Sequence, residues 1–221
     1  MYFLDSLLLN LYHFFNMDFE RILTSIFASF IIMIRRIIYL IVSPYKTMRA
    51  ISTDGDILQA GIILIGVVGY FFIANKFRPY EYHPALLSFI TILHILGTMS
   101  FFAIFTALSD KKKHINICSF IMLFSYALIP TLVWFVVNSW LFVFIPPPRT
   151  LSLLGKGFSI IYMSFSVALL AWKMILVYLA IRYATSFQFF RIIYSLFIYL
   201  AIIIPYSLLL YSFGLFRIPF L

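Results

Sequence analysis

Few side chains of this sequence are placed to do chemistry. The histidines lack the HExxH or i, i+4 spacing of a metal site, and the single cysteine forms no zinc or disulfide pattern. The acidic residues near the apolar segments fall in predicted loops, so no pair of carboxylates is placed for acid–base catalysis. No glycine-rich phosphate loop is found, and we therefore predict a non-catalytic protein without metal or cofactor. The residues considered are His13, His83, His94, His114, Asp54, Asp56, Glu81, Asp110 and Cys118.

Two polar residues fall inside long apolar segments and are the candidates for intramembrane polar or partner contacts. His94 shares a helical face with Thr91 and Thr98. Its imidazole either bonds to hydroxyl or carbonyl groups of a neighbouring helix or lines a polar cavity. Lys173 has no acidic residue in any apolar segment to pair with it. It either extends toward Arg182, about 13 Å along the helix, or bonds to freed carbonyls, or meets a lipid phosphate or a partner's carboxylate.

The composition sets the environment of these residues. Of the 221 residues 64 % are hydrophobic and 10 % are charged, with a mean hydropathy of +1.08. Soluble domains are about 45–50 % apolar and about 25 % charged. No Asp or Glu follows Asp110, although nine Lys and Arg do. An integral membrane protein explains both observations, because charge is excluded from hydrocarbon and cations gather at span ends. Since the net charge of +9 is scattered over these ends, no nucleic-acid partner is predicted.

Apolar runs of about 20 residues predict five membrane-spanning helices. The predicted spans are residues 57–74, 84–108, 115–138, 158–181 and 190–215. They form one membrane domain, residues 57–221, preceded by an N-terminal region, residues 1–56. Pro130 and Pro205 fall inside two spans and are predicted to kink them. Small residues line one face of the fourth span, where they allow close helix contact within the chain or between copies of it. These small residues are Ser164, Ala168 and Ala171.

Residues 21–43 resemble a further span but are predicted to lie flat in the membrane interface. At 100° per residue, the polar residues of this segment fall within one arc of roughly 140°, and large apolar residues occupy most of the rest. The adjacent Arg35 and Arg36 would each cost about 2.5–3.5 kcal/mol in the middle of a membrane. A true span whose arginines face a protein groove remains the alternative. The apolar residues 2–19 are expected to form a shorter helix at the same depth.

The distribution of lysine and arginine predicts the orientation. With five spans, more of these cations fall in the N-terminal region and the loops on its side than in the loops on the opposite side. This places the N-terminus in the cytoplasm and the C-terminus outside, in the inner (cytoplasmic) membrane of a bacterium. Cations near the cytoplasmic surface attract anionic headgroups, at about 1 kcal/mol each. The candidate membrane-interface or lipid contacts are Arg21, Arg35, Arg36, Lys111, Lys112 and Lys113.

Three segments carry a resemblance to a known family of membrane proteins. Residues 43–51, Ser-Pro-Tyr-Lys-Thr-Met-Arg-Ala-Ile, precede the first span, and residues 124–130, Phe-Ser-Tyr-Ala-Leu-Ile-Pro, lie in the third. Trp172 and Arg182 precede the last apolar span. In order and spacing these segments resemble the Ypt-interacting-protein (YIP) family of five-span membrane proteins, in its short prokaryotic form. The chain lacks the Asp-Leu-Tyr-Gly-Pro signature of the eukaryotic members, so Rab GTPase binding is not carried over.

The resemblance implies a five-span fold and a non-catalytic role. With the in-plane helix, the expected fold is an all-α integral membrane protein, a five-transmembrane-helix bundle with an N-terminal amphipathic helix. The implied role is membrane organisation or service as an accessory subunit of a larger membrane complex. The alternative is a partner subunit of an ABC-type exporter or a lipid-transport system. Expected partners are membrane lipids and other integral membrane proteins, and self-association is left open.

Overall fold

The chain folds into helices joined by short connections. The computed structural model describes the backbone of residues 2–77, 82–109, 116–144, 153–185 and 187–215, and the side chains of these residues except 2–19, 22, 142, 153 and 154. The helices are α1 (Tyr2–Val42), α2 (Pro44–Thr53), α3 (Ile57–Phe77), α4 (Pro84–Ser109), α5 (Ile117–Tyr126), α6 (Ile129–Phe144), α7 (Leu153–Thr185) and α8 (Phe189–Ser212). Because every element in these ranges is helical, the predicted all-α class is confirmed.

Six segments of the described helices are long and apolar enough to cross a membrane, which fits a membrane protein. They are Leu23–Val42, Ile57–Phe77, Pro84–Ser109, Ile117–Leu141, Gly155–Thr185 and Phe189–Ser212. The last five correspond to the five predicted spans, with boundaries that differ by a few residues. α7 extends beyond its predicted span at both ends, because a helix continues past its apolar part wherever the chain still forms backbone hydrogen bonds.

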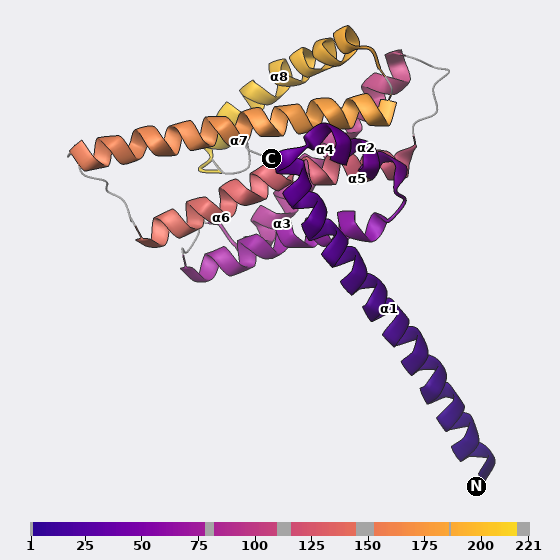
Figure 1. Ribbon diagram of the computed structural model, residues 1–221. Helices are drawn as coiled ribbons and strands as arrows, with labels where there is room; N and C mark the ends of the chain where they lie inside the picture. Colours follow the sequence, from indigo (N-terminus) through magenta and orange to yellow (C-terminus); the bar gives the residue numbers. More distant parts are fainter. Residues whose placement is uncertain (1, 78–81, 110–115, 145–152, 186, 216–221) are drawn as a thin grey trace.

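The helices of the bundle alternate in direction, so that two ends can be distinguished (Figure 1). At one end, the thiol of Cys118 in α5 donates to the Gly55 carbonyl just before α3, at 3.7 Å. α2 packs on α7 and α5 at this same end. At the opposite end, the Tyr82 hydroxyl before α4 donates to the Phe213 carbonyl after α8, at 2.7 Å. We call the first of these the α2 end of the bundle.

The predicted third span is interrupted in its middle. α5 stops at Tyr126, and α6 begins at Ile129. Pro130 lacks the N–H that would bond to the Tyr126 carbonyl, which frees this carbonyl and allows the break. The Leu128 N–H bonds instead to the Ser125 carbonyl at 3.1 Å, in a tighter turn. α8, by contrast, remains one helix across Pro205.

α1 corrects one expectation from the sequence. Residues 2–19 do not form a shorter helix of their own, because a single helix runs from Tyr2 to Val42. The physical reason is local: this stretch contains neither glycine nor proline, so nothing in the chain favours a stop. α1 packs on α2 and α3, and its N-terminal part projects away from the bundle (Figure 1).

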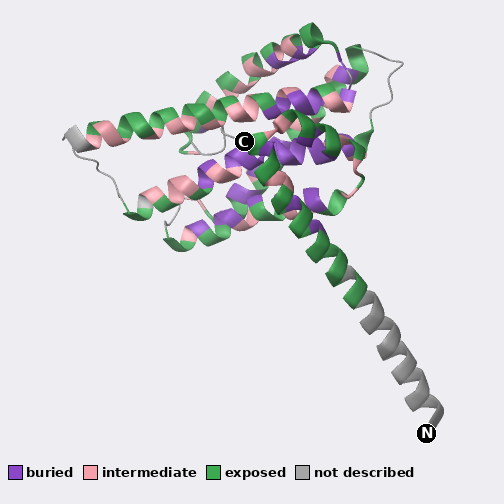
Figure 2. Ribbon diagram, viewed as in Figure 1, coloured by how far each residue is buried: buried purple, intermediate pink, exposed green. Residues whose placement is uncertain are grey.

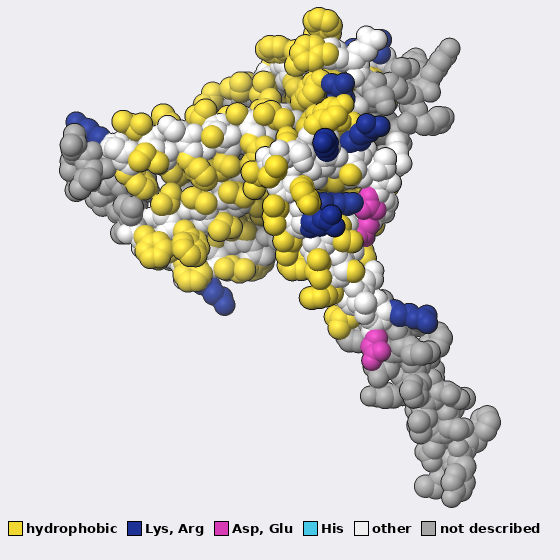
Figure 3. All heavy atoms as spheres, viewed as in Figure 1, with side chains coloured by type: hydrophobic (Ala, Val, Ile, Leu, Met, Phe, Trp, Pro, Cys, Tyr) yellow, Lys and Arg dark blue, Asp and Glu magenta, His cyan; other side chains and the backbone are white. Residues whose placement is uncertain are grey.

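The core of the molecule lies toward the α2 end. Buried residues concentrate in α2, α5 and the last part of α7, while the first part of α7 is mostly exposed (Figure 2). Large side chains with less than 2 % exposure in this region include Leu40, Met48, Ile51, Met122, Leu123, Tyr126, Leu176 and Ile181. The outer surface of the bundle is also apolar, as expected for helices solvated by hydrocarbon (Figure 3).

Candidate functional site

α1 meets the bundle through one narrow stripe of its surface. Among its described side chains the buried ones are Ser29, Met33 and Leu40, and Arg36 between them is half-buried. These residues follow one another at intervals of three or four, so they share one face of the helix. Apolar residues on the remaining faces are exposed. With the partly buried Ile37 on the same face, the contact of α1 with the bundle therefore combines three apolar anchors with two polar ones, Ser29 and Arg36.

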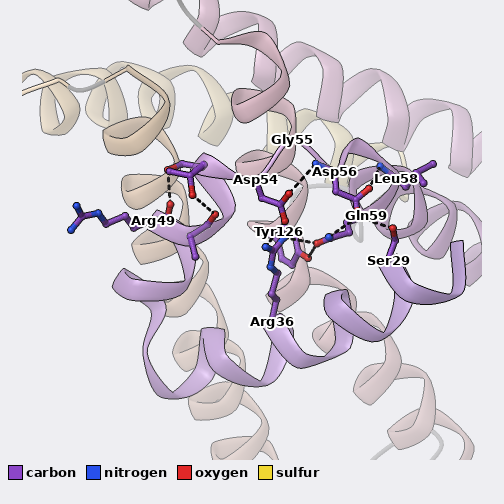
Figure 4. A network of polar contacts seen from close by, with 12 residues as sticks. Ser29, Arg36, Arg49, Asp54, Gly55, Asp56, Leu58, Gln59 and Tyr126 are labelled. Atoms are coloured by element: carbon purple, nitrogen blue, oxygen red, sulfur yellow. Dashed lines mark hydrogen bonds and ion pairs between the residues drawn. The ribbon is translucent and has the colours of Figure 1, made fainter. Parts of the chain in front are cut away.

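The two polar anchors enter a network that joins α1 to α3 and α5 (Figure 4). The Ser29 hydroxyl donates to Asp56 Oδ2 at 2.6 Å. Arg36 donates from Nη2 to Asp54 Oδ2, in an ion pair, and from Nη1 to Gln59 Oε1 at 2.8 Å. We call this set, which Tyr126 completes, the latch network. Its members are Ser29, Arg36, Asp54, Asp56, Gln59 and Tyr126.

Gln59 is the centre of the latch network. Its side chain is fully buried, and its amide oxygen accepts hydrogen bonds from both Arg36 and the hydroxyl of Tyr126, which is also fully buried. Its amide nitrogen donates to Asp56 Oδ2 at 2.8 Å. A buried amide is favourable only when its donor and acceptor are satisfied, and both are satisfied here. Gln59 thus connects the start of α3 to α1 on one side and to α5 on the other.

The connection between α2 and α3 places the two carboxylates for this role. The Asp54 N–H caps α2 by bonding to the Ile51 carbonyl at 3.2 Å. Asp54 Oδ1 accepts from the Asp56 N–H, and Asp56 Oδ1 accepts from the Leu58 N–H, each at 3.3 Å. Each carboxylate therefore uses one oxygen for the local turn and the other for α1 or Gln59. The loop predicted for these carboxylates is confirmed, since α2 ends at Thr53 and α3 begins at Ile57.

Asp56 is held in its charged form by these neighbours. Partial burial acts to raise the pKa of its carboxyl. Hydrogen bonds from Ser29, Gln59 and the Leu58 N–H, with the nearby charge of Arg36, act in the opposite direction and prevail. The pKa of Asp56 consequently lies below its ordinary value, so this carboxylate is ionised at neutral pH.

Lys173 lies in a second polar region, in the middle of the bundle. It borders a cavity of about 90 Å³ between α4, α5, α7 and α8, which Thr98 and Tyr199 also line. It borders a smaller space beside Pro130 and Thr131, so α7 passes directly against the break between α5 and α6. α7 contacts both α5 and α6 in the structure.

His94 is buried and faces α8. Its ring stacks on Tyr206 with centroids 5.5 Å apart and an interplanar angle of 17°. On the same face of α4, the hydroxyls of Thr98 and Tyr199 share a hydrogen bond of 2.9 Å. Thr98, rather than His94, is the residue of this face that lines the 90 Å³ cavity.

The candidate lipid contacts occupy different environments. Arg21 and Arg35 are exposed on α1, where the Arg35 guanidinium lies 5.5 Å from the centroid of the Tyr39 ring. Arg36 points into the latch network instead. The predicted contacts at positions 111–113 lie outside the described residues. Sequence reasoning missed Gln59, although an amide inside an apolar span three residues after a loop carboxylate was a usable signal.

Comparison with known proteins does not assign the chain to a family. No protein-family model matches the chain, and neither the curated proteins nor the solved structures give a match. The functional proposal therefore depends on the chain's own residues and contacts.

Proposed function

We propose that this protein is a non-catalytic integral membrane protein of the YIP type in a bacterial inner membrane. Helices α3 to α8 provide five spans, since α5 and α6 together make one. α1 lies in the cytoplasmic interface, with the N-terminus in the cytoplasm and the C-terminus outside. The protein organises the membrane locally or acts as an accessory subunit of a larger membrane complex, and α1 is the part that its surroundings or its partner engage.

The observation that carries this proposal is the way the latch network holds α1. Ser29 and Arg36 are seven residues apart, or about 10 Å along the helix. Their partners Asp54, Asp56 and Gln59 nevertheless all lie at the start of α3. A helix running alongside α3 would meet partners spread along α3. The contacts fit a helix that crosses over the end of α3 at the level where a span enters the membrane.

The exposed surface of α1 supports the same placement. Most of its described apolar residues are exposed, and Phe27, Ile38 and Ile41 are 58–66 % exposed. Arg35 is exposed beside them, and the cations near α2 are at the same end of the bundle (Figure 3). An interfacial helix needs an apolar face for the acyl region and cations for the headgroups.

A second candidate function is service as a partner subunit of an ABC-type exporter or a lipid-transport system. The observation that favours it is the small-residue stripe of α7. Ser164, Ala168 and Ala171 are all exposed, so the bundle does not use them for its own packing. Small residues on a membrane-facing helix allow the close approach of a helix from another subunit. Constant co-purification with such a complex from native membranes would favour this alternative.

The experiment that tests the proposal compares two adjacent arginines of α1. Arg36→Asp reverses the charge that pairs with Asp54, and Arg35→Asp makes the same change at an exposed position. We expect Arg36→Asp, like deletion of residues 1–43, to abolish partner association while the spans remain inserted. Arg35→Asp should retain it, and Arg36→Asp combined with Asp54→Arg should restore part of it. The measurement is a native pull-down at endogenous level, followed by mass spectrometry.

Two results would contradict the proposal. If Arg36→Asp and the deletion capture the same proteins as the natural chain, α1 is not the engaged element. If tagging finds both ends of the chain on one side of the membrane, the five-span placement is wrong.

A further inference from the structure

α2 and the last part of α7 pack against each other at the α2 end of the bundle. The rings of Tyr45 and Tyr183 meet edge to face, with centroids 5.5 Å apart. The Arg182 guanidinium lies 5.9 Å from the centroid of the Tyr45 ring and donates from Nη1 to the Tyr178 hydroxyl at 3.1 Å. These contacts hold Arg182 at the junction between the two helices, which we call the α2–α7 seam.

Arg49 brings a second guanidinium to this seam. It follows Tyr45 by four residues, so the two side chains leave the same face of α2. Figure 4 shows the Arg49 side chain directed away from the latch network. The pKa of the Tyr45 hydroxyl lies below its ordinary value, because the Tyr183 hydroxyl lies beside it and because Arg182 and Arg49 favour the phenolate. Both arginines therefore act on the same small region.

No carboxylate within the two helices neutralises this region. Neither α2 nor α7 contains an acidic residue, and the sequence has none after Asp110. The first acid after α2, Asp54, pairs with Arg36, and this is the only ion pair among residues with described side chains. Two guanidinium groups at one seam favour an anion, and their forked N–H groups match the oxygens of a phosphate.

The surface beside the seam is apolar. Ile175 on α7 and Phe189 and Phe190 on α8 are each at least half exposed. The Phe189 ring contacts Tyr178, with centroids 6.0 Å apart, so this apolar surface adjoins the cationic one. Arg182 lies three residues before the end of α7, at the depth where headgroups surround a span. A ligand that covers both surfaces has a phosphate and acyl chains.

We propose that the α2–α7 seam binds the phosphate of an anionic lipid headgroup. Arg49 and Arg182 hold the phosphate oxygens, and the acyl chains lie along α7 and α8. This inference rests on the proposed membrane placement of the bundle. It assigns a lipid site to residues outside the latch network.

The test measures lipid selectivity of the purified full-length chain. The probes are spin-labelled phosphatidylglycerol and spin-labelled phosphatidylcholine, in vesicles of phosphatidylcholine. We expect the natural chain to prefer phosphatidylglycerol, and the double variant Arg49→Gln, Arg182→Gln to lose this preference by on the order of tenfold. Arg191→Gln is the matched control, because Arg191 is exposed at the same end of the bundle and stacks on Phe187 rather than on a residue of the seam. This control should keep the preference.

Each other outcome overturns the proposal. Equal loss in the control indicates general attraction by surface charge, and retention in the double variant indicates that the seam is not the site. Displacement of the lipid by inorganic phosphate indicates a site for soluble anions. If the double variant does not fold, the single variant Arg49→Gln tests the site, because the exposed Arg49 side chain makes no described hydrogen bond. The single variant should lose part of the lipid preference. An unchanged preference refutes the site.

Failure of this inference is distinguishable from failure of the proposed function. The partner pull-down depends on Arg36 and α1, whereas lipid selectivity depends on Arg49 and Arg182. A chain that loses its partner on Arg36→Asp but shows no lipid preference keeps the proposed function and refutes the lipid site.

Discussion

The latch network and the surroundings of Lys173 accommodate a basic residue in different ways. Arg36 is paired with Asp54 and bonds to Gln59, and the side chains of the ion pair are 17 % and 34 % exposed. Lys173 lies between helices that contain no acidic residue, and it lines the same cavity as Thr98 and Tyr199. The first region balances charge with charge, and the second surrounds a cation with neutral groups.

This difference follows from where the sequence places its acids. Asp54 and Asp56 lie directly before α3, outside the apolar runs, and the one ion pair among the described side chains is formed there. A carboxylate left without its cation in a partly buried site is costly, whereas removal of a cation from neutral surroundings leaves no charge behind. Substitutions in the two regions should therefore differ in cost, and this difference is open to measurement.

The largest effect is expected for Gln59→Leu. This change leaves the Tyr126 hydroxyl, one Arg36 donor and one Asp56 acceptor without their shared partner. We expect the free energy of unfolding in detergent to fall by about 2–3 kcal/mol. Gln188→Leu is the matched control, because Gln188 is exposed and its side chain does not cap α8. The control should change the free energy of unfolding by less than about 0.5 kcal/mol. Similar losses in both variants would show that Gln59 is not the centre of the latch network.

The next prediction compares the two basic residues directly. Arg36→Met leaves Asp54 without its cation and should cost about 1–2 kcal/mol, less than a fully buried pair because both side chains are partly exposed. Lys173→Met keeps a similar volume and leaves no carboxylate behind, so its cost should be below about 1 kcal/mol or should be reversed in sign. The two variants are compared by thermal unfolding in the same detergent. A larger loss for Lys173→Met would refute the contrast between the two regions.

Local features of the fold could be predicted from the sequence. Long apolar runs set the helix positions, because only helices satisfy their backbone within hydrocarbon. The turn at Asp54–Asp56 and the disturbance at Pro130 follow from residue types with strong local preferences. These features do not depend on how the helices pack, so they could be predicted from the sequence alone.

Features that depend on packing could not be predicted in the same way. The contact of Tyr126 with Gln59 joins residues 67 positions apart, and it depends on how α5 packs on α3. The amphipathic pattern of α1 indicated a polar face, but it did not separate Arg35, which is exposed, from Arg36, which faces the protein. The continuity of α1 was missed because apolar composition, rather than the lack of glycine and proline, guided the division.

A smaller effect is expected for the neutral pair of the second region. Thr98→Val and Tyr199→Phe each remove one end of the 2.9 Å hydrogen bond between α4 and α8. Hydrogen bonds between membrane helices contribute about 0.6 kcal/mol on average, so each variant should lose about that amount. A double-mutant cycle, measured by unfolding in detergent, should give a coupling energy of similar size. Strictly additive losses would indicate that the two hydroxyls do not depend on each other.

The smallest effect concerns pH and belongs to the latch network alone. The pKa of Asp56 is lower in the folded chain than its ordinary value of 3.8, so its charged form is favoured by folding. The resulting stability is present above the unfolded pKa and is lost as the pH falls through the folded pKa. Because Asp56 is only partly buried, this contribution should be below about 1 kcal/mol.

α1 should therefore stay docked throughout the neutral and mildly acidic range and loosen only below about pH 4. The measurement uses a chain that carries Met33→Cys and Cys118→Ser. The accessibility of the cysteine at position 33 is measured by its rate of reaction with a disulfide reagent that remains active in acid. Asp56→Asn should reduce this acid-dependent change, because the amide has no proton to gain. Loosening near pH 6 instead would point to a histidine, and the carboxylates of the latch would then not control the docking of α1.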